Sequence, residues 1–448
     1  EDHFKDFVKE NVQAHCRTPF KEATWKQLAD GIRFVQGTFD DPKAFERLSN
    51  TVAELDRDRG TRGNHAFYMS VPPRAFPQVS RQLADCGLAK SDKGAWRRVI
   101  IEKPFGHDLA SAKELDRVVS EVFDPSSVFR IDHYLGKETV QNLLVFRFAN
   151  GIFEPIWNHK YIDHIEISVC ESIGTGGRAG YFDSAGILRD IVQNHALQLL
   201  CLVALEPPVA FEADAVRDEK VKVLRSIRRL KHEEVSRKTV RGRYQSGAIA
   251  GERVKGYLAE EGVSEKSTTE TYVALEFAID NWRWAGVPIF LRAGKRLPKK
   301  ITEISIHFRY APHTLFESED VEFLRPNILS FEIQPDESIS LRISSKPPGP
   351  KVRVQPVNMD FSYGTSFGVE PPEAYERLLL DCMRRDPTLF TRDDEIEEAW
   401  GLIQPILDVW QGAGKSAPPV YGYEAGSWGP AAADEMLQRS IGRGWRRL

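Results

Sequence analysis

Residues 130–138 read RIDHYLGKE and place a carboxyl, an imidazole, a phenol and an ammonium group within six positions. An apolar pair, Val128 and Phe129, precedes the stretch. Open α/β sheets bind ligands beyond the carboxyl ends of their strands, and titratable groups gathered there are candidates for acid–base chemistry. The alternative for such a cluster, taken alone, is a charged turn whose residues only pair with one another and with solvent.

Composition limits the classes of protein to be considered. The chain has 448 residues, which is enough for one or two large cores, and two domains are expected. Hydrophobic residues make up 41% and charged residues 28%, which excludes a disordered or fibrous protein. A net charge of -4 gives no general attraction to nucleic acid or to an anionic membrane, so we expect neither as a partner.

The cysteines indicate the compartment. They number five and are far apart, with no CxxC pair. This pattern is typical of a reduced, cytoplasmic protein, and we expect no structural zinc and no other metal site. The longest apolar run, around residues 197–205, is too short to cross a bilayer.

The first part of the chain has the pattern of a parallel α/β sheet. Short apolar runs alternate with amphipathic segments; the runs are 32–36, 65–70, 99–101 and 127–131, and the segments are 42–57, 74–86 and 108–122. Strands this short and continuous suit burial on both faces of a sheet. We predict a Rossmann-type, doubly wound dinucleotide-binding domain over residues 1–130. It is incomplete, because the sequence opens on a helix pattern, and no strand or glycine fingerprint precedes residue 32.

The remainder of the chain has a different period. Apolar residues alternate with polar ones over 269–279, 304–308, 329–333, 339–343 and 357–361, and helical patterns cover 184–205, 372–384 and 393–411. Period-two strands with one apolar face predict an antiparallel sheet that packs on helices. We therefore predict a larger α+β domain over residues 131–448, with an antiparallel sheet and helices.

One string does match the dinucleotide fingerprint, GTGGRA at residues 174–179. A pyrophosphate site needs the N-terminus of a helix directly after the glycines. We expect residues 180–184 to continue as loop, and we interpret this string as an active-site loop.

Three predicted strand ends of the first domain carry notable residues: Pro72 and Pro73, Lys103 in the EKPFG segment, and Asp132 with His133. The carboxyl ends of parallel strands lie on one side of a sheet, so these residues should face one crevice. For Lys103 alone, an ordinary surface lysine is the alternative.

The ordered motifs together resemble glucose-6-phosphate dehydrogenases, and the resemblance covers essentially the whole chain. The motifs are EKPFG at 102–106, RIDHYLGKE at 130–138, GRAGYFD at 177–183, RDIVQNH at 189–195, VRDEKVK at 216–222, LRAGK at 291–295 and YERL at 375–378. The family implies oxidation of β-D-glucose 6-phosphate to 6-phospho-D-glucono-1,5-lactone with a nicotinamide coenzyme.

The resemblance also implies the catalytic pair. His195 shares an apolar helical stripe with Ile187, Ile191 and Leu199, which by itself favours a histidine of the core. In the family this histidine is the general base, and Asp132 is the carboxylate that pairs with it. We therefore expect the two side chains to touch.

The remaining roles are carried over by motif position. The resemblance assigns the phosphate to His133, Tyr134 and Lys137, with Lys295 and Lys300 contributing. It assigns the sugar hydroxyls to Glu171, Asp190 and Gln334. Lys103 would bridge substrate and nicotinamide, next to Pro72 and Pro73. The coenzyme implied is NADP, with NAD possible, and the assembly implied is a homodimer or homotetramer.

The sequence departs from the family pattern in two ways, and two alternative functions remain open. The coenzyme preference is inherited by analogy, because the fingerprint is missing, and Glu332 stands where relatives with a second, structural NADP carry a cation. The first rival is a sugar dehydrogenase of the inositol or glucose–fructose oxidoreductase type, which also carries a Glu-Lys-Pro segment. The second is a sugar-phosphate-binding protein without catalysis.

Overall fold

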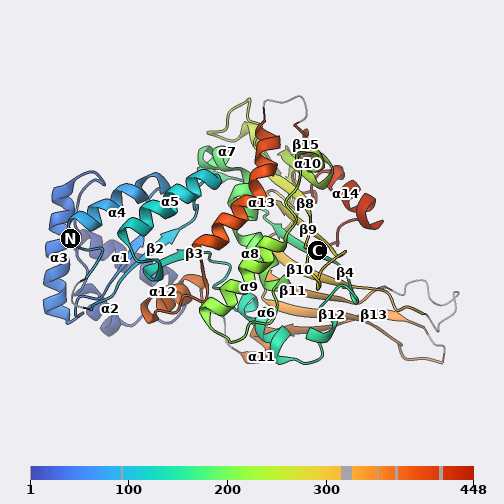
Figure 1. The fold of residues 1–448 in the computed structure, drawn as a ribbon, viewed down its shortest axis with the longest axis horizontal. Coiled ribbons are helices and arrows are strands. Elements are labelled where there is room, and N and C mark those ends of the chain that lie inside the picture. Colours follow the sequence, from blue (N-terminus) through green and yellow to red (C-terminus); the bar gives the residue numbers. More distant parts are fainter. Residues whose placement is uncertain (1, 92–93, 314–324, 351–352, 369–371, 413–416) are drawn as a thin grey trace. The chain divides into compact units, whose positions relative to one another are not determined.

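The structure, a computed structural model, describes residues 2–91, 94–313, 325–350, 353–368, 372–412 and 417–448 (Figure 1). Its internal contacts divide the chain into two compact units. Unit 1 comprises Glu1–Gly106 and Lys113–Ile131, and unit 2 comprises His107–Ala112 and Asp132–Leu448. In the described part of the chain, no helix combines the length and the apolar character that crossing a membrane requires.

Unit 1 contains a parallel sheet in the order β1–β2–β3 with helices before and between its strands. The strands are β1 (His65–Met69), β2 (Arg97–Glu102) and β3 (Val128–Ile131), and the helices are α1 (Asp2–His15), α2 (Glu22–Ala29), α3 (Pro42–Arg59), α4 (Phe76–Asp85) and α5 (Leu109–Val122). All four residues of β3 are buried, as a strand covered on both faces requires. The α/β class predicted for the first part of the chain is confirmed.

The strand expected at residues 32–36 is wrong. The structure assigns no regular element to residues 32–38. An extended segment becomes a strand only when a neighbour receives its backbone hydrogen bonds. Among the described strands none pairs with this segment, so its apolar sequence was a misleading signal.

Unit 2 is built on a large sheet. In its described residues the sheet has nine strands in the order β13-β12-β11-β10-β4-β9-β8-β5-β15. The strands are β4 (Ile162–Cys170), β5 (Thr239–Gln245), β8 (Tyr272–Ala278), β9 (Pro288–Gly294), β10 (Ile301–Phe308), β11 (Ile328–Gln334), β12 (Ser338–Ser345), β13 (Gln355–Ser362) and β15 (Val420–Glu424). The predicted antiparallel character holds except for two parallel pairs, β4 with β9 and β5 with β15.

The two faces of this sheet differ in polarity. Ile167, Ile304 and Phe331 are paired directly across β4, β10 and β11, and Phe331 packs edge-on against Phe146 of a helix with ring centroids 5.1 Å apart. This apolar face is therefore the helix side. Because side chains alternate along a strand, His164 and Glu166 of β4 lie on the opposite, polar face.

Helices α6 (Glu138–Ala149) and α10 (His232–Lys238) and the π-helix η5 (Leu188–Ala196) pack on the sheet (Figure 1). Helices α8 (Leu197–Ala204) and α13 (Asp393–Gln411) pack on these, and α9 (Ala213–Ser226) packs on α8 and α13. The other α-helices and strands in the described part of unit 2 are α7 (Ala179–Ile187), α11 (Tyr363–Phe367), α12 (Ala374–Arg384), α14 (Ala431–Ile441), β6 (Gly247–Ile249), β7 (Glu252–Val254) and β14 (Phe390–Thr391). The α+β class predicted for the second part is confirmed.

The loop expected at residues 180–184 is wrong, because α7 begins at Ala179. A helix therefore does follow the glycines of GTGGRA, but side chains of other segments lie against the first of these glycines. A Cβ at Gly174 would meet the Glu260 carboxylate, which also accepts a hydrogen bond from Thr175. The guanidinium of Arg296 lies at the same glycine and pairs with Glu260 over 3.7 Å, so side chains already fill the space beside the glycine turn.

Candidate active site

His195 and Asp132 are in direct contact within unit 2. The ring nitrogen Nδ1 of His195 lies 2.5 Å from Oδ1 of Asp132, and the two side chains are 1% and 2% exposed. With Nδ1–H donated to the carboxylate, a neutral His195 carries its lone pair on Nε2. The expected contact is present, and the arrangement suits an imidazole that takes a proton at Nε2.

The environment keeps Asp132 ionised. Burial alone raises the pKa of this carboxyl, but the charge and hydrogen bond of His195, the charge of His133 and the backbone N–H of Tyr134 outweigh burial and lower the pKa to about 2. The Tyr134 N–H donates to Oδ1 over 3.0 Å. A carboxylate at this position stabilises the imidazolium that forms when His195 accepts a proton.

His195 is carried by a helix with a capped and sterically restricted start. The helical run of η5 and α8 follows a kink at Gly186, where φ is 70° and ψ is 166°. A Cβ there would collide with the carboxylate of Glu270, which accepts a hydrogen bond from Leu188 N over 3.2 Å. Only glycine meets both the positive φ and the close approach of this cap. The π geometry of η5 is a feature that often marks functional sites.

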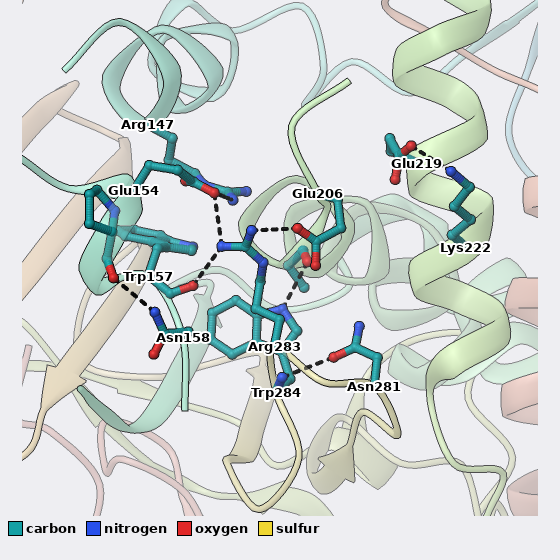
Figure 2. A network of polar contacts seen from close by, with 12 residues as sticks. Arg147, Glu154, Trp157, Asn158, Glu206, Glu219, Lys222, Asn281, Arg283 and Trp284 are labelled. Atoms are coloured by element: carbon teal, nitrogen blue, oxygen red, sulfur yellow. Dashed lines mark hydrogen bonds and ion pairs between the residues drawn. The ribbon is translucent and has the colours of Figure 1, made fainter. Parts of the chain in front are cut away.

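The far end of the same run is anchored by buried side chains (Figure 2). The last carbonyls of a helix lack partners within the helix. Arg147 donates to Leu202 O and Val203 O over 3.2 and 3.0 Å, and the indole N–H groups of Trp157 and Trp284 donate to Val203 O and Ala204 O over 2.8 Å each. The helix that positions His195 is thus fixed at both ends.

The charge of Arg147 is balanced inside this anchor. Its guanidinium is fully buried and lies 3.1 Å from Glu154, and Arg283 links Glu154 to Glu206 (Figure 2). Burial lowers the pKa of Arg147 to about 10, with Glu154 acting in the opposite direction. A buried cation that also caps a helix C-terminus complements the negative end of the helix dipole.

Tyr134 packs against the imidazole of His195. Its ring stacks on His195 with centroids 4.3 Å apart and an interplanar angle of 15°. The phenol oxygen accepts a hydrogen bond from Gln334 Nε2 over 2.9 Å and lies 3.3 Å from Thr302 Oγ1. Burial raises the pKa of Tyr134. Tyr134 therefore stays a neutral phenol, and two polar groups fix its position.

Two lysines, Lys137 and Lys300, bring positive charge to this part of unit 2. Lys137 is half-buried, and burial together with the charge of Lys300 lowers its pKa, while Glu337 and Glu373 raise it. Glu337 is engaged by Thr139, whose N–H and hydroxyl both donate to it. Two lysines that influence each other in this way provide positive potential for an anion.

The predicted phosphate residue His133 lies next to the pair. Its ring centroid is 4.6 Å from that of His195 and 6.2 Å from that of Tyr375, with which it stacks at 12°. Tyr375 was not predicted as a site residue, and neither was Thr302. Thr302 faces Gln334 across the strand pair β10–β11, a neighbour relation that becomes visible only when the register is known.

The other predicted residues divide between the units. Lys295 lies 2.5 Å from Glu171 in an ion pair whose members are 9% and 24% exposed, so the structure joins a predicted phosphate residue to a predicted hydroxyl residue. Asp190 is half-buried and lies one π-turn before His195, because π-helical bonds join residues i and i+5. In unit 1, Pro72, Pro73 and Lys103 follow the carboxyl ends of the parallel strands β1 and β2.

Fold and site together define the class: a dehydrogenase in which a parallel α/β unit of the dinucleotide-binding type precedes an α+β unit with a buried histidine–carboxylate pair. A family model described as "Glucose-6-phosphate dehydrogenase, NAD binding domain" matches residues 1–142. Another, "Glucose-6-phosphate dehydrogenase, C-terminal domain", matches residues 144–446. The chain belongs to the glucose-6-phosphate dehydrogenase family.

Curated relatives and solved structures agree with this assignment. The chain is 52% identical to glucose-6-phosphate 1-dehydrogenase 2 of Mycobacterium tuberculosis, over 99% of this chain and 85% of the relative. A solved structure of glucose-6-phosphate dehydrogenase in complex with its substrate glucose 6-phosphate matches with a TM-score of 0.88, at 35% identity, over 99% of this chain and 89% of that one. The Mycobacterium avium enzyme matches with a TM-score of 0.81, at 36% identity, over 100% and 89%.

Proposed function

We propose that the protein oxidises β-D-glucose 6-phosphate at C1 to 6-phospho-D-glucono-1,5-lactone, the first step of the oxidative pentose phosphate pathway. Family membership supports the reaction, and the contact between His195 and Asp132 is the single observation that carries the mechanism. A bound nicotinamide coenzyme supplies the hydride acceptor.

His195 is the proposed base. Its Nε2 takes the proton of the C1 hydroxyl, while the Asp132 carboxylate holds the ring through Nδ1 and stabilises the imidazolium. Catalysis by a positioned base of this kind contributes roughly 10² to 10⁴ in rate. Tyr134, stacked on the ring, limits its rotation and keeps Nε2 directed at the substrate.

The proposed phosphate site uses His133, Tyr134 and Lys137, with Lys295 and Lys300. A phosphomonoester carries nearly two charges, so it needs several donors and cations. Lys137 and Lys300 act on each other electrostatically, which supports a shared anion site. The proposed hydroxyl ligands are Glu171, Asp190 and Gln334, whose carboxylate and amide groups can accept hydrogen bonds from the sugar.

Unit 1 is the proposed coenzyme unit. The carboxyl ends of parallel strands bind nucleotides in folds of this type, and Pro72, Pro73 and Lys103 lie at these ends of β1 and β2. The family resemblance is what assigns Lys103 to both the sugar phosphate and the nicotinamide. We propose NADP as the preferred coenzyme, with NAD as the alternative substrate.

We also propose a cytoplasmic homodimer or homotetramer. The five cysteines, all within the described residues, form no disulfide with one another, which suits a reducing compartment. Exposed apolar side chains near the end of the large sheet, Val357 and Met359 at 41% and 60%, would be covered by a second copy of the chain. Sedimentation velocity checks this: a monomer at micromolar concentration contradicts it.

Absorbance of the reduced nicotinamide tests the function. The full-length protein is mixed with glucose 6-phosphate and with NADP or NAD in separate reactions, and unphosphorylated glucose is the control substrate. We expect reduction with the sugar phosphate, faster with NADP. Reduction with glucose alone would favour a sugar dehydrogenase of the inositol type, and binding of glucose 6-phosphate without reduction would favour a non-catalytic protein.

A further inference from the structure

A second cluster of ligand-type side chains lies on the polar face of the large sheet. His164 and Glu166 are two positions apart on β4 and so share a face, and His307 of β10 is the direct cross-strand neighbour of His164. The three side chains are buried, with exposed fractions of 1%, 3% and 8%. The proposed function assigns no role to them.

The distances within the cluster match those between the ligand atoms of a zinc ion. Oε1 of Glu166 lies 3.4 Å from Nε2 of His164 and 3.3 Å from Nε2 of His307. Ligand atoms bound to tetrahedral Zn²⁺ at its usual bond lengths are about 3.3 to 3.4 Å apart. The ligand atoms of all three residues lie within 4.8 Å of one another. One ion could therefore reach all three with small adjustments.

Outer contacts orient the carboxylate and one imidazole for this role. Nδ1 of His164 lies 2.9 Å from Asp163 and Nε2 lies 3.4 Å from Oε1 of Glu166, so both ring nitrogens face carboxylates and an ion at Nε2 would take the place of the hydrogen there. The backbone N–H of Arg446 donates to Oε2 of Glu166 over 2.9 Å, so Oε1 is the oxygen that faces the imidazoles. A carboxylate behind a ligating histidine is a recurrent feature of zinc sites.

A buried nitrogen of His307 gives separate support for a metal ion at this place. Its Nε2 is buried and has no hydrogen-bond partner in the described residues, a costly state for a polar atom. The same nitrogen lies 3.3 Å from Oε1 of Glu166, so an ion bound between these two atoms would satisfy both.

We propose that His164, Glu166 and His307 form a binding site for Zn²⁺ or a divalent ion of similar preference. Imidazole and carboxylate ligands suit such ions, whereas Mg²⁺ prefers an oxygen shell. The rings, which stack at 19° with centroids 4.1 Å apart, must turn about χ2 so that both lone pairs meet. That torsion is broad for histidine. A water molecule would complete the tetrahedron.

The charges near the site permit a dication. The guanidinium of Arg446 is paired with Glu303 over 2.8 Å. Glu166 and Asp163 supply two negative charges, against which Arg309 and Arg443 reach Asp163 only at 4.0 Å. Because Arg446 also holds Glu166, the ion would tie β4, β10 and the C-terminal residues together.

The site is separate from the proposed catalytic centre. Thr302, which contacts Tyr134, shares the helix side of β10 with Ile304, whereas His307 pairs with His164 on the other face. Metal binding should therefore change stability and leave turnover largely as it is. If no metal ion binds, the proposed function is unaffected.

Metal binding is tested with Zn²⁺ and with Co²⁺ as a coloured probe. The full-length protein is stripped with a chelator and titrated with Co²⁺ in the presence of excess Mg²⁺. We expect one ion per chain, with the visible absorption of four-coordinate Co²⁺ that Zn²⁺ abolishes, and a higher melting temperature with Zn²⁺. Absence of uptake, or competition by Mg²⁺, overturns the proposal.

Variants locate the ion. His307→Asn and Glu166→Gln should each weaken Co²⁺ affinity more than about 100-fold, and Asp163→Asn, which removes only the outer carboxylate, about 10- to 100-fold. His232→Asn, in an exposed histidine, is the control for nonspecific imidazole binding and should bind as the wild type does. Retained turnover of glucose 6-phosphate shows that each variant is folded. Equal affinity in His307→Asn and the wild type overturns the assignment.

Discussion

Tyr134 lies flat against His195, and its hydroxyl is held by Gln334 at 2.9 Å with Thr302 at 3.3 Å. Three elements far apart in sequence thus set the position of one imidazole. Gln334 also donates to Thr302 over 2.9 Å, so the three polar groups form one small network. The orientation of the proposed base depends on this network as well as on Asp132.

Replacing Thr302 by Val should misplace Tyr134 and Gln334 without touching the proposed base. A buried partner left unsatisfied costs about 1 to 3 kcal/mol. We expect kcat/KM for glucose 6-phosphate to fall about tenfold, since about 1.4 kcal/mol corresponds to that factor. Thr239→Val is the control, because Thr239 is a buried threonine that donates to Val235 O over 2.7 Å outside the proposed site. Equal kinetic losses in both variants would contradict the network.

Asp132→Asn should retain the shape of the site but lose the charge that holds His195. An amide can donate to Nδ1 and so favour the wrong tautomer, which lowers kcat by roughly 10² to 10⁴. Steady-state kinetics with saturating glucose 6-phosphate measures the effect. Asp163→Asn is a matched control, because Asp163 lies 2.9 Å from a histidine Nδ1 on the polar face of the sheet. A normal kcat in Asp132→Asn would remove this carboxylate from the mechanism.

Acid should destabilise the protein partly through Asp132. Its pKa is about 2 in the folded protein against an ordinary value of 3.8, so the unfolded chain binds the proton more readily. The ionised group therefore stabilises the fold above about pH 4, and this contribution, about 2 kcal/mol, is lost as the pH falls towards 2. Urea unfolding at a series of pH values should give a shallower acid slope for Asp132→Asn. Parallel slopes would contradict the lowered pKa.

Arg147→Met should loosen the helix that carries His195. The substitution removes the hydrogen bonds to Leu202 O and Val203 O and leaves Glu154 without that partner. Breaking a buried ion pair costs about 3 to 5 kcal/mol, whereas an exposed pair contributes about 1 kcal/mol or less. Arg228→Met is the control, since Arg228 and Asp280 are 53% and 51% exposed. Thermal unfolding compares the two, and similar melting temperatures would contradict the anchor.

Strands of unit 1 were predictable where burial on both faces leaves a continuous apolar run, as in β3. The same signal failed at residues 32–36, because a run of apolar residues does not show whether a neighbouring strand exists. The break at Gly186 and the π geometry of η5 were also missed. The apolar stripe of Ile187, Ile191 and Leu199 fits a helix, but it does not show whether the backbone hydrogen bonds join residues four or five apart.

The residues of the site also include some that were predicted and some that were missed. Asp132 and His195, separated by 63 positions, were joined by resemblance to a family and not by any local pattern. Thr302 was missed because it lies 168 positions from Tyr134 and depends on strand register. The expectation of no metal site rested on cysteine spacing, which cannot detect His164 and His307 facing each other across two strands.

The proposed role of His195 as the base is tested most directly by His195→Asn, with kcat and the dissociation constant for glucose 6-phosphate measured on the same preparation. We predict that kcat falls by roughly 10² to 10⁴ while the sugar phosphate binds almost as tightly as before, because the phosphate and hydroxyl ligands remain. Turnover close to that of the wild type would contradict the account.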